Sequence, residues 1–183
     1  MSKQVLVPIA DGSEEIEAVC IIDVLRRAGA KVTVASVNKL QVTASRGVRI
    51  VADALISECQ ANTYDLIALP GGIPGAEQLR DSEVLTELLK RQVREGRLCG
   101  AICASPVIVL QHHDLLEGRA ATSHPGFSER LENTECIDSR VVVDGNLVTS
   151  RGPGTAIEFA LKLVEILFGK EKASEVAAPM IIR

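Results

Sequence analysis

Short apolar runs that alternate with helical patterns are the feature that most constrains the fold of this chain. The runs lie at residues 4–9, 31–37, 66–69 and 98–102, and each has the length of a buried strand. Only 2% of the residues are aromatic, so the core is expected to be aliphatic, as it is in parallel sheets covered by helices. We predict an α/β fold with a doubly wound, mostly parallel sheet and helices on both faces.

The segments between these runs predict the helices and two hairpins. Helices are expected at residues 14–28, with Ser13 as the N-cap, and at residues 83–94, each followed by a glycine. A last long helix is expected to open at residues 150–154 and to close at Gly169. Residues 40–54 predict a small hairpin, and residues 141–143 are expected to pair with 147–149. The length of 183 residues suits a single domain over residues 1–183.

Charge and hydropathy argue against nucleic-acid and membrane proteins. Lys and Arg number 20 against 24 Asp and Glu, which gives a formal charge of −4, and the sequence has no basic stripe. No apolar stretch reaches the ~18 residues of a membrane span, and the first apolar run is too short for a signal peptide. We therefore expect a cytoplasmic protein whose primary ligand is neither nucleic acid nor membrane.

The five cysteines form an odd and scattered set. They lack paired Cys-x-x-Cys spacing, which argues against a disulfide framework and against structural zinc. Four of them are expected to serve as small buried hydrophobic residues, namely Cys20, Cys59, Cys99 and Cys136. We expect no metal and no cofactor.

Cys103 differs from the other cysteines because it lies where a strand gives way to a helix. A nucleophile elbow forces its central residue into a strained turn and requires small residues two positions before and after it. Here these positions hold Ala101 and Ser105. The N-terminus of the following helix is expected to lower the pKa of the thiol through its free N–H groups. Cys103 is the predicted nucleophile.

Glu17 is a carboxylate on the apolar side of the first helix. At ~100° per residue, Glu15 falls on the polar side of that helix, whereas Glu17 projects into the middle of the apolar side. Burial raises the pKa of a carboxyl group, and a protonated Glu17 can hydrogen-bond a thiolate and later transfer protons. The alternative is a structural ion pair between Glu17 and Arg46 or Arg27.

A glycine-rich turn follows the strand at residues 66–69. The backbone N–H groups of Gly71 and Gly72, together with that of Ala104, can face a developing oxyanion. A plain tight turn is the competing explanation. Phosphate binding is disfavoured because the segment lacks the endings of a P-loop or a dinucleotide fingerprint.

Two further side chains are candidates for the same site. Glu14 leans toward the side of the helix that carries Glu17, although in the first turn it can simply favour the helix dipole. His124 can assist Cys103 as a base or as an orienting group, because a cysteine nucleophile often works with a histidine distant in sequence. His112 and His113 are expected at the surface.

Five ordered motifs resemble the ThiJ/PfpI superfamily, and within it the Parkinsonism-associated DJ-1 branch and its bacterial ThiJ-like relatives. They span nearly the whole chain, at residues 12–17 (GSEEIE), 69–72 (LPGG), 101–104 (AICA), 124–125 (HP) and 149–155 (TSRGPGT).

The resemblance implies a flavodoxin-like fold, a homodimer, an oxidation-sensitive nucleophile at Cys103 and a protonated Glu17 that hydrogen-bonds it. His124 matches a family histidine near the thiol. Protease-like relatives place a histidine directly after the nucleophile, where this chain has Ala104, so peptidase activity is not expected. Members of this branch are described as glutathione-independent glyoxalases, as deglycases, and as oxidative-stress sensors and chaperones.

Two hypotheses of function follow. In the first, Cys103 attacks methylglyoxal, glyoxal or their adducts while Glu17 transfers protons, so that the protein is a glyoxalase or deglycase that protects against carbonyl and oxidative stress. In the alternative, Cys103 is oxidised to sulfenic or sulfinic acid and the protein acts as a redox-sensing chaperone for client proteins.

Overall fold

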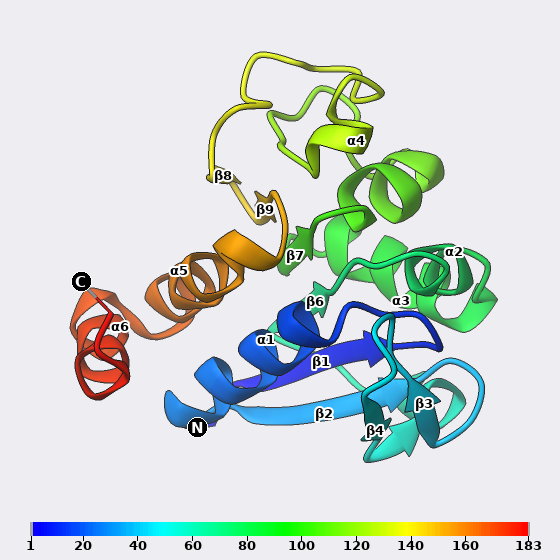
Figure 1. Cartoon of the computed structure of the whole chain (residues 1–183), viewed down its shortest axis with the longest axis horizontal. Coiled ribbons are helices and arrows are strands. Elements are labelled where there is room, and N and C mark those ends of the chain that lie inside the picture. Colours follow the sequence, from blue (N-terminus) through cyan, green and yellow to red (C-terminus); the bar gives the residue numbers. More distant parts are fainter. Residues whose placement is uncertain (1, 183) are drawn as a thin grey trace.

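The computed structural model describes residues 2–182, in which seven strands form one sheet with the order β5-β2-β1-β6-β7-β9-β8 (Figure 1). Neighbouring strands are parallel except for β8 and β9, which form the antiparallel hairpin at one edge. The strands are β1 (Gln4–Ile9), β2 (Lys31–Ser36), β5 (Ala54–Leu55), β6 (Leu66–Leu69), β7 (Leu98–Ile102), β8 (Val141–Asp144) and β9 (Leu147–Ser150).

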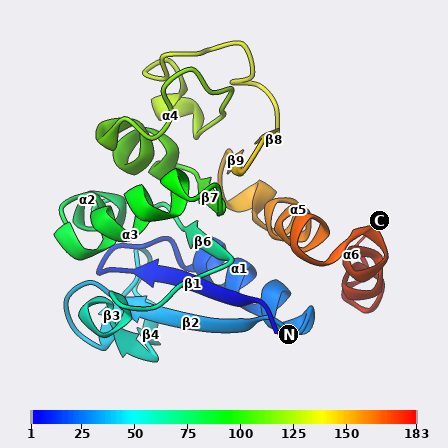
Figure 2. The same cartoon turned by 180° about the vertical axis from the view of Figure 1, so that it is seen from behind.

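Helices cover both faces of this sheet, as two opposite views show (Figures 1 and 2). On one face, α1 (Glu15–Arg27) packs against α5 (Ala156–Phe168), and α3 (Glu83–Arg94) lies on the other face. The shorter helices are α2 (Gly75–Arg80), α4 (Pro125–Ser128) and α6 (Lys170–Ala177). Within residues 2–182, every helix is too short or too polar to cross a bilayer. The predicted single-domain, doubly wound α/β fold is confirmed.

The apolar runs predicted three strands without error. Strands β1, β6 and β7 begin and end at the expected residues, and β2 ends one residue early at Ser36. The first helix begins at Glu15 with Glu14 as its N-cap, so the assignment of Ser13 as the cap is wrong. The Ser13 hydroxyl accepts a hydrogen bond from Ala10 N instead, which closes the preceding turn.

A separate hairpin of β3 (Gln41–Thr43) and β4 (Arg49–Val51) confirms the expected excursion at residues 40–54. One backbone hydrogen bond and one side-chain hydrogen bond attach this hairpin to the loop that follows β1. Gly12 N donates to Thr43 O at 2.9 Å, and Thr43 N donates to the Asp11 carboxylate at 2.7 Å. The hairpin therefore lies against the beginning of α1, next to the residues that carry the candidate site.

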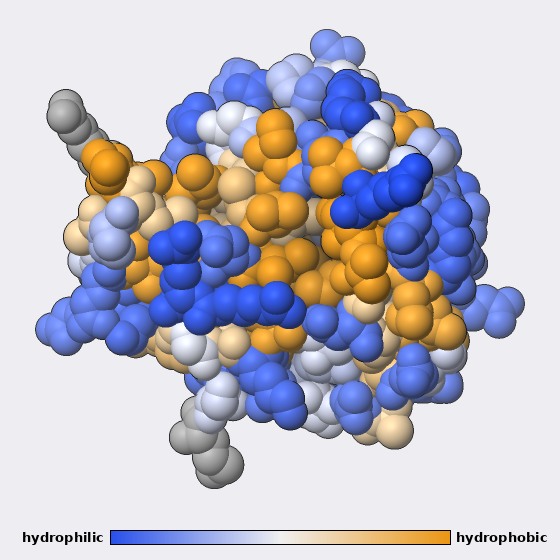
Figure 3. All heavy atoms as spheres, turned by 60° about the horizontal axis from the view of Figure 1, so that its bottom comes forward, coloured by the Kyte–Doolittle hydropathy of each residue, from blue (hydrophilic) through white to orange (hydrophobic). Residues whose placement is uncertain are grey.

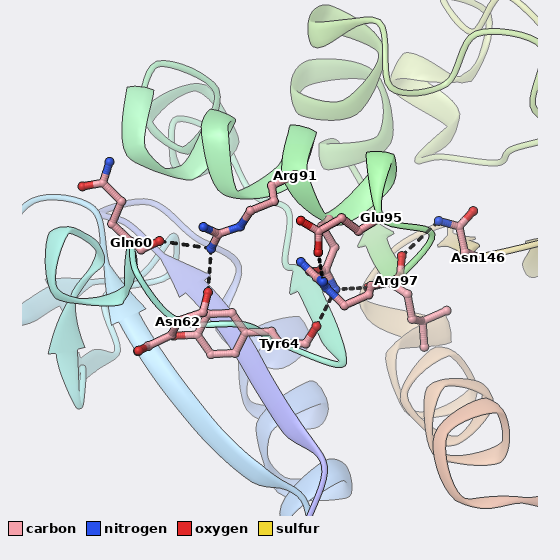
Figure 4. Close-up of polar contacts among 9 residues, drawn as sticks. Gln60, Asn62, Tyr64, Arg91, Glu95, Arg97 and Asn146 are labelled. Carbon is pink, nitrogen blue, oxygen red and sulfur yellow. Dashed lines mark hydrogen bonds and ion pairs between the residues drawn. The ribbon is translucent and has the colours of Figure 1, made fainter.

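The amino ends of the central strands are held by polar side chains of α3 (Figure 4). Gln92 is buried, and its amide donates to Tyr64 O at 3.1 Å and to Leu98 O at 2.9 Å. Arg91 donates to Asn62 O at 2.6 Å. Backbone carbonyl oxygens at this edge of the sheet thus accept hydrogen bonds from side chains instead of from backbone N–H groups. The candidate site described below occupies the opposite, carboxyl edge, where ligands of open α/β sheets bind.

Candidate active site

Cys103 occupies a strained turn directly after β7. Its φ is +65°, which is rare for a residue other than glycine, asparagine or aspartate. Hydrogen bonds fix this turn on both sides: Cys103 N donates to Ser150 O at 3.0 Å, and Cys103 O accepts from His124 N at 2.9 Å. The buried Ser105 hydroxyl donates to Pro70 O at 2.6 Å, a contact that the small-residue pattern did not reveal. The predicted elbow geometry is confirmed.

Glu17 lies on the buried face of α1 and is fully inaccessible to solvent. Its Oε2 accepts a hydrogen bond from Gly71 N at 2.7 Å, and its Oε1 is buried with no N–H or O–H donor among residues 2–182. Burial raises the pKa of Glu17 to about 7, with a smaller contribution from the negative charge of Glu14, against the opposing hydrogen bonds of Gly71 and Cys103. The expected rise in the pKa of Glu17 is confirmed.

The thiol of Cys103 does not have the lowered pKa that its place at a helix N-terminus predicted. Burial raises the pKa of Cys103 to about 12, and both the charge of Glu17 and its hydrogen bond with the thiol add to the rise. The N–H groups of Gly72 and Ala104 act in the opposite direction, because they stabilise a thiolate, but they are outweighed. The prediction of a lowered pKa was wrong because it neglected, first, the burial of the sulfur and, second, the carboxylate of Glu17 next to it.

Neither arginine proposed as a partner of Glu17 reaches it. Arg27 pairs with Asp23 at 2.6 Å on the surface of α1, and Arg46 N donates to Glu15 at 2.8 Å. Glu15 itself is buried, contrary to its expected place on the polar side, because the turn of the β3–β4 hairpin covers it. The structural ion pair is therefore excluded for the described residues, and Glu17 keeps the thiol as its neighbour.

The glycine turn after β6 brings a third segment to the thiol. A Cβ on Gly71 would lie 2.6 Å from the Cβ of Cys103 and 3.0 Å from Glu17 Oε2, so only glycine fits. Gly72 has a φ of +87°, and a Cβ there would collide with the backbone of Glu14. The turn is thus more than a plain reversal, because its tight approach aims the N–H of Gly71 at Glu17 and that of Gly72 at the sulfur.

Glu14 is adjacent to this cluster and caps α1. Its carboxylate accepts a hydrogen bond from Glu17 N at 2.9 Å, and its own N–H donates to Gly71 O at 2.9 Å. Its spacing of three residues from Glu17 is that between an N-cap and the third helical residue, but the sequence did not indicate this cap because glutamate is not among the usual N-cap residues.

His124 approaches Cys103 through its backbone, while its exposed ring caps α4. The ring Nδ1 accepts from Gly126 N at 3.0 Å, and the residue is exposed to solvent. The catalytic role of His124 stays a prediction. His112 is exposed as expected, but His113 is half-buried, because its Nε2 lies 2.9 Å from Arg80 O and 3.2 Å from the Thr86 hydroxyl.

The other four cysteines are free and lie outside this cluster. Cys59 and Cys99 are buried as expected, whereas Cys20 and Cys136 are only partly buried. A groove of about 710 Å³ runs along α5 and α6, and it is lined by none of Cys103, Glu17, Glu14, Gly71 and His124. We place the candidate site at Cys103, because strain, burial and perturbed titration meet there.

A strained cysteine elbow that faces a buried glutamate at the carboxyl edge of a parallel sheet defines an α/β protein with a thiol–carboxyl centre. Residues 3–166 match the DJ-1/PfpI family, and the chain belongs to this family.

Relatives in plants and animals support this assignment. Protein DJ-1 homolog B of Arabidopsis thaliana is 53% identical over 98% of this chain, although the chain spans only 41% of that relative's length. The Caenorhabditis elegans protein named glutathione-independent glyoxalase DJR-1.2 is 39% identical, over 99% of this chain and 96% of the relative. The solved structure of oxidized Toxoplasma gondii DJ-1 is 53% identical with a TM-score of 0.97, and the match covers 99% of each chain.

Proposed function

We propose that this chain is a cytoplasmic, glutathione-independent glyoxalase that converts small 2-oxoaldehydes into 2-hydroxy acids. The observation that carries the proposal is the pairing of a strained thiol with a buried carboxyl group whose pKa is about 7. A carboxyl group with this pKa accepts and returns protons efficiently near neutral pH. The relative named as a glutathione-independent glyoxalase supports the same reaction class.

The first step is the attack of the Cys103 sulfur on the aldehyde carbon of methylglyoxal. The S–H bond breaks as the thiol passes its proton to the Glu17 carboxylate, a C–S bond forms and the carbonyl electron pair moves to oxygen. That oxygen then takes the proton from Glu17 to give a hemithioacetal. The N–H groups of Gly72 and Ala104, which face the sulfur, are placed to stabilise negative charge on the neighbouring oxygen.

The second stage moves hydrogen between the two carbons. The Glu17 carboxylate removes the proton from the former aldehyde carbon and returns it to the ketone carbon, while the hydroxyl proton passes between the two oxygens. The product is a lactoyl thioester on Cys103. Water then attacks the thioester carbon, the C–S bond breaks and the sulfur recovers a proton. One carbon is oxidised and its neighbour reduced, so the reaction needs no external oxidant, cofactor or glutathione.

The access to the sulfur favours small substrates. Cys103 is only 8% exposed, which suits free methylglyoxal or glyoxal better than an aldehyde adduct on a folded protein. Deglycation of small adducts would use the same thiol and the same proton transfer. Small adducts are therefore a second substrate class of the same site.

The test is lactate formation from methylglyoxal without glutathione. Wild type is compared with Cys103→Ala and Glu17→Gln, and Cys136→Ala serves as a control that removes a partly buried cysteine elsewhere. We expect loss of turnover in the first two variants and wild-type rates in the control. Equal rates in all four proteins, or no lactate from wild type, contradict the proposal.

A second candidate function, a redox sensor with chaperone activity, is favoured by the donors around the sulfur. The N–H groups of Gly72 and Ala104 face the thiol, and a protonated Glu17 supplies a third donor to the oxygens of a sulfinate. Mild peroxide followed by mass spectrometry is expected to modify Cys103 first. Earlier oxidation of Cys59 or Cys136 speaks against the sensor.

We also propose that the protein is a homodimer that uses the outer surface of α1 and the β3–β4 hairpin. Large apolar side chains are exposed there, with Val51 68%, Ile16 52%, Val48 50% and Val19 49% exposed. A surface view shows apolar side chains gathered in the middle of one face, with hydrophilic side chains around and between them (Figure 3). Sedimentation of wild type and Val51→Glu tests this proposal, and a monomeric wild type contradicts it.

A further inference from the structure

We propose that Glu14 is a positioning residue that holds the Glu17 carboxyl group against the Cys103 thiol. The inference rests on the proposed function, because it assigns to Glu14 a part in the proton transfer by Glu17 without contact between Glu14 and substrate.

Three hydrogen bonds close a ring among Glu14, Glu17 and Gly71. Glu17 N donates to Glu14 Oε2 at 2.9 Å, Gly71 N donates to Glu17 Oε2 at 2.7 Å, and Glu14 N donates to Gly71 O at 2.9 Å. Each residue is a donor to one neighbour and an acceptor from the other. Since Gly71 touches Cys103, the ring fixes the start of α1 relative to the elbow.

The identity of the cap matters for this ring. Ser, Thr, Asp and Asn are the usual N-cap residues, and a serine is available at the preceding position. Ser13, however, is turned away and bonded to Ala10 N. Glu14 takes the cap position with a longer side chain, and it thereby places a full negative charge three residues before Glu17.

Charge gives Glu14 a second influence on Glu17. The titratable groups that act on Glu17 are Cys103 from the elbow and Glu14 from its own helix. The pKa of Cys20 on the same helix is raised by burial, with further contributions from the charges of Asp23, Glu14 and Glu17. Glu14 adds to the effect of burial in raising the pKa of Glu17, whereas Cys103 lowers it. The ring therefore sets the place of the proton-transfer group, and the cap charge helps to set the pH at which it works.

Two substitutions separate these effects. Glu14→Gln keeps an oxygen that can accept from Glu17 N but removes the charge, so kcat on its plateau should stay near wild type while the acid limb of the pH profile moves to lower pH. Glu14→Ala removes the cap as well, and we expect kcat to fall about 10- to 100-fold with little change in KM, as misplacement of a catalytic group does. Rescue of kcat by glutamine relative to alanine identifies the positioning role.

Ser82→Ala is the matched control, because Ser82 caps α3 and accepts from Leu85 N far from the site. It should lower thermal stability without changing kcat or the pH profile. The proposal is overturned if Glu14→Ala keeps the wild-type kcat, if Glu14→Gln keeps the wild-type pH profile, or if Ser82→Ala lowers kcat as much as Glu14→Ala.

The pH dependence of Cys103 alkylation by iodoacetamide is measured on the same proteins, and its acid limb should also move to lower pH in Glu14→Gln. This readout does not use an aldehyde. If wild type fails to turn over methylglyoxal, the proposed function fails, and the alkylation profiles still decide whether Glu14 controls the pair. Identical alkylation profiles in wild type and Glu14→Gln overturn the inference.

Discussion

The Cys103 thiol and the Glu17 carboxyl group shift each other's pKa in opposite directions. The hydrogen bond with Cys103 lowers the pKa of Glu17, although burial keeps it at about 7, whereas burial and the Glu17 carboxylate together raise the pKa of Cys103 to about 12. Two groups that interact this strongly titrate as a pair. Above pH about 7 the pair holds one proton, and a thiolate exists whenever that proton resides on Glu17.

The first prediction concerns the reactivity of Cys103 toward alkylating agents. In wild type the alkylation rate should rise through pH about 7, because loss of the first proton creates the one-proton state. Glu17→Gln cannot take up the proton, so its rate should show only a single thiol titration and no step near pH 7. Intact-mass measurements of iodoacetamide labelling from pH 5 to pH 10 check this. Superimposable profiles for the two proteins contradict the pairing.

The second prediction follows from linkage between protonation and folding. The folded state holds the Glu17 proton more tightly than the unfolded state, because its pKa rises from 4.5 to about 7. The contribution of the Glu17 proton to the free energy of unfolding is complete below pH 4.5 and is lost as the pH rises to 7. The free energy of unfolding thereby changes by roughly 3 kcal/mol.

Glu17→Gln should therefore have a higher Tm than wild type at pH 8, and the difference should shrink toward pH 5. Thermal unfolding at both pH values measures it, with the exposed Glu117→Gln as control. A gain that is the same at pH 5 and pH 8 disproves the linkage.

Sequence periodicity predicted those helices and strands whose limits are marked by their own residues. The runs of β1, β6 and β7 are buried along almost their whole length, so hydrophobicity marks their ends. Helix α2 has only six residues after a glycine-rich turn, and α6 starts directly after the glycine that ends α5, so neither has a distinct pattern. Strand β5 has two residues at a sheet edge, which is too short for any alternation.

For the site, the sequence predicted which residues come together more accurately than it predicted their pKa values. Helical spacing correctly placed Glu17 on the buried side of α1, and the small neighbours of Cys103 correctly predicted a strained turn. The shift in the pKa of the thiol was predicted with the wrong sign, because it depends first on the burial of the sulfur and second on the Glu17 carboxylate, and both arise only from tertiary packing. Glu15 was misplaced for a related reason, since the hairpin that buries it comes from a distant part of the chain.

The third prediction tests the close approach at the glycine turn. In Gly71→Ala the new methyl group must displace the Cys103 side chain or the backbone of Ala104, which lie 2.6 and 2.9 Å from the ideal Cβ position. We expect a loss of stability of about 1–3 kcal/mol and at least ~10-fold lower kcat/KM. Gly154→Ala is the control, because a Cβ there meets open space. Equal effects of the two substitutions contradict a special role for Gly71.

The fourth prediction concerns Glu15, which joins α1 to the β3–β4 hairpin. Its buried carboxylate accepts from the Ser45 hydroxyl at 2.8 Å and from Arg46 N at 2.8 Å, so Glu15→Ala leaves both donors without their partner. The expected loss of stability is about 1–3 kcal/mol. Faster amide exchange should appear at residues 41–51 while the strands beside Cys103 remain protected, because the ring around Glu17 does not include Glu15. Hydrogen exchange followed by mass spectrometry measures both regions, with Glu117→Gln as the surface control. Faster exchange in β7 as well as in the hairpin would mean that Glu15 supports the site itself.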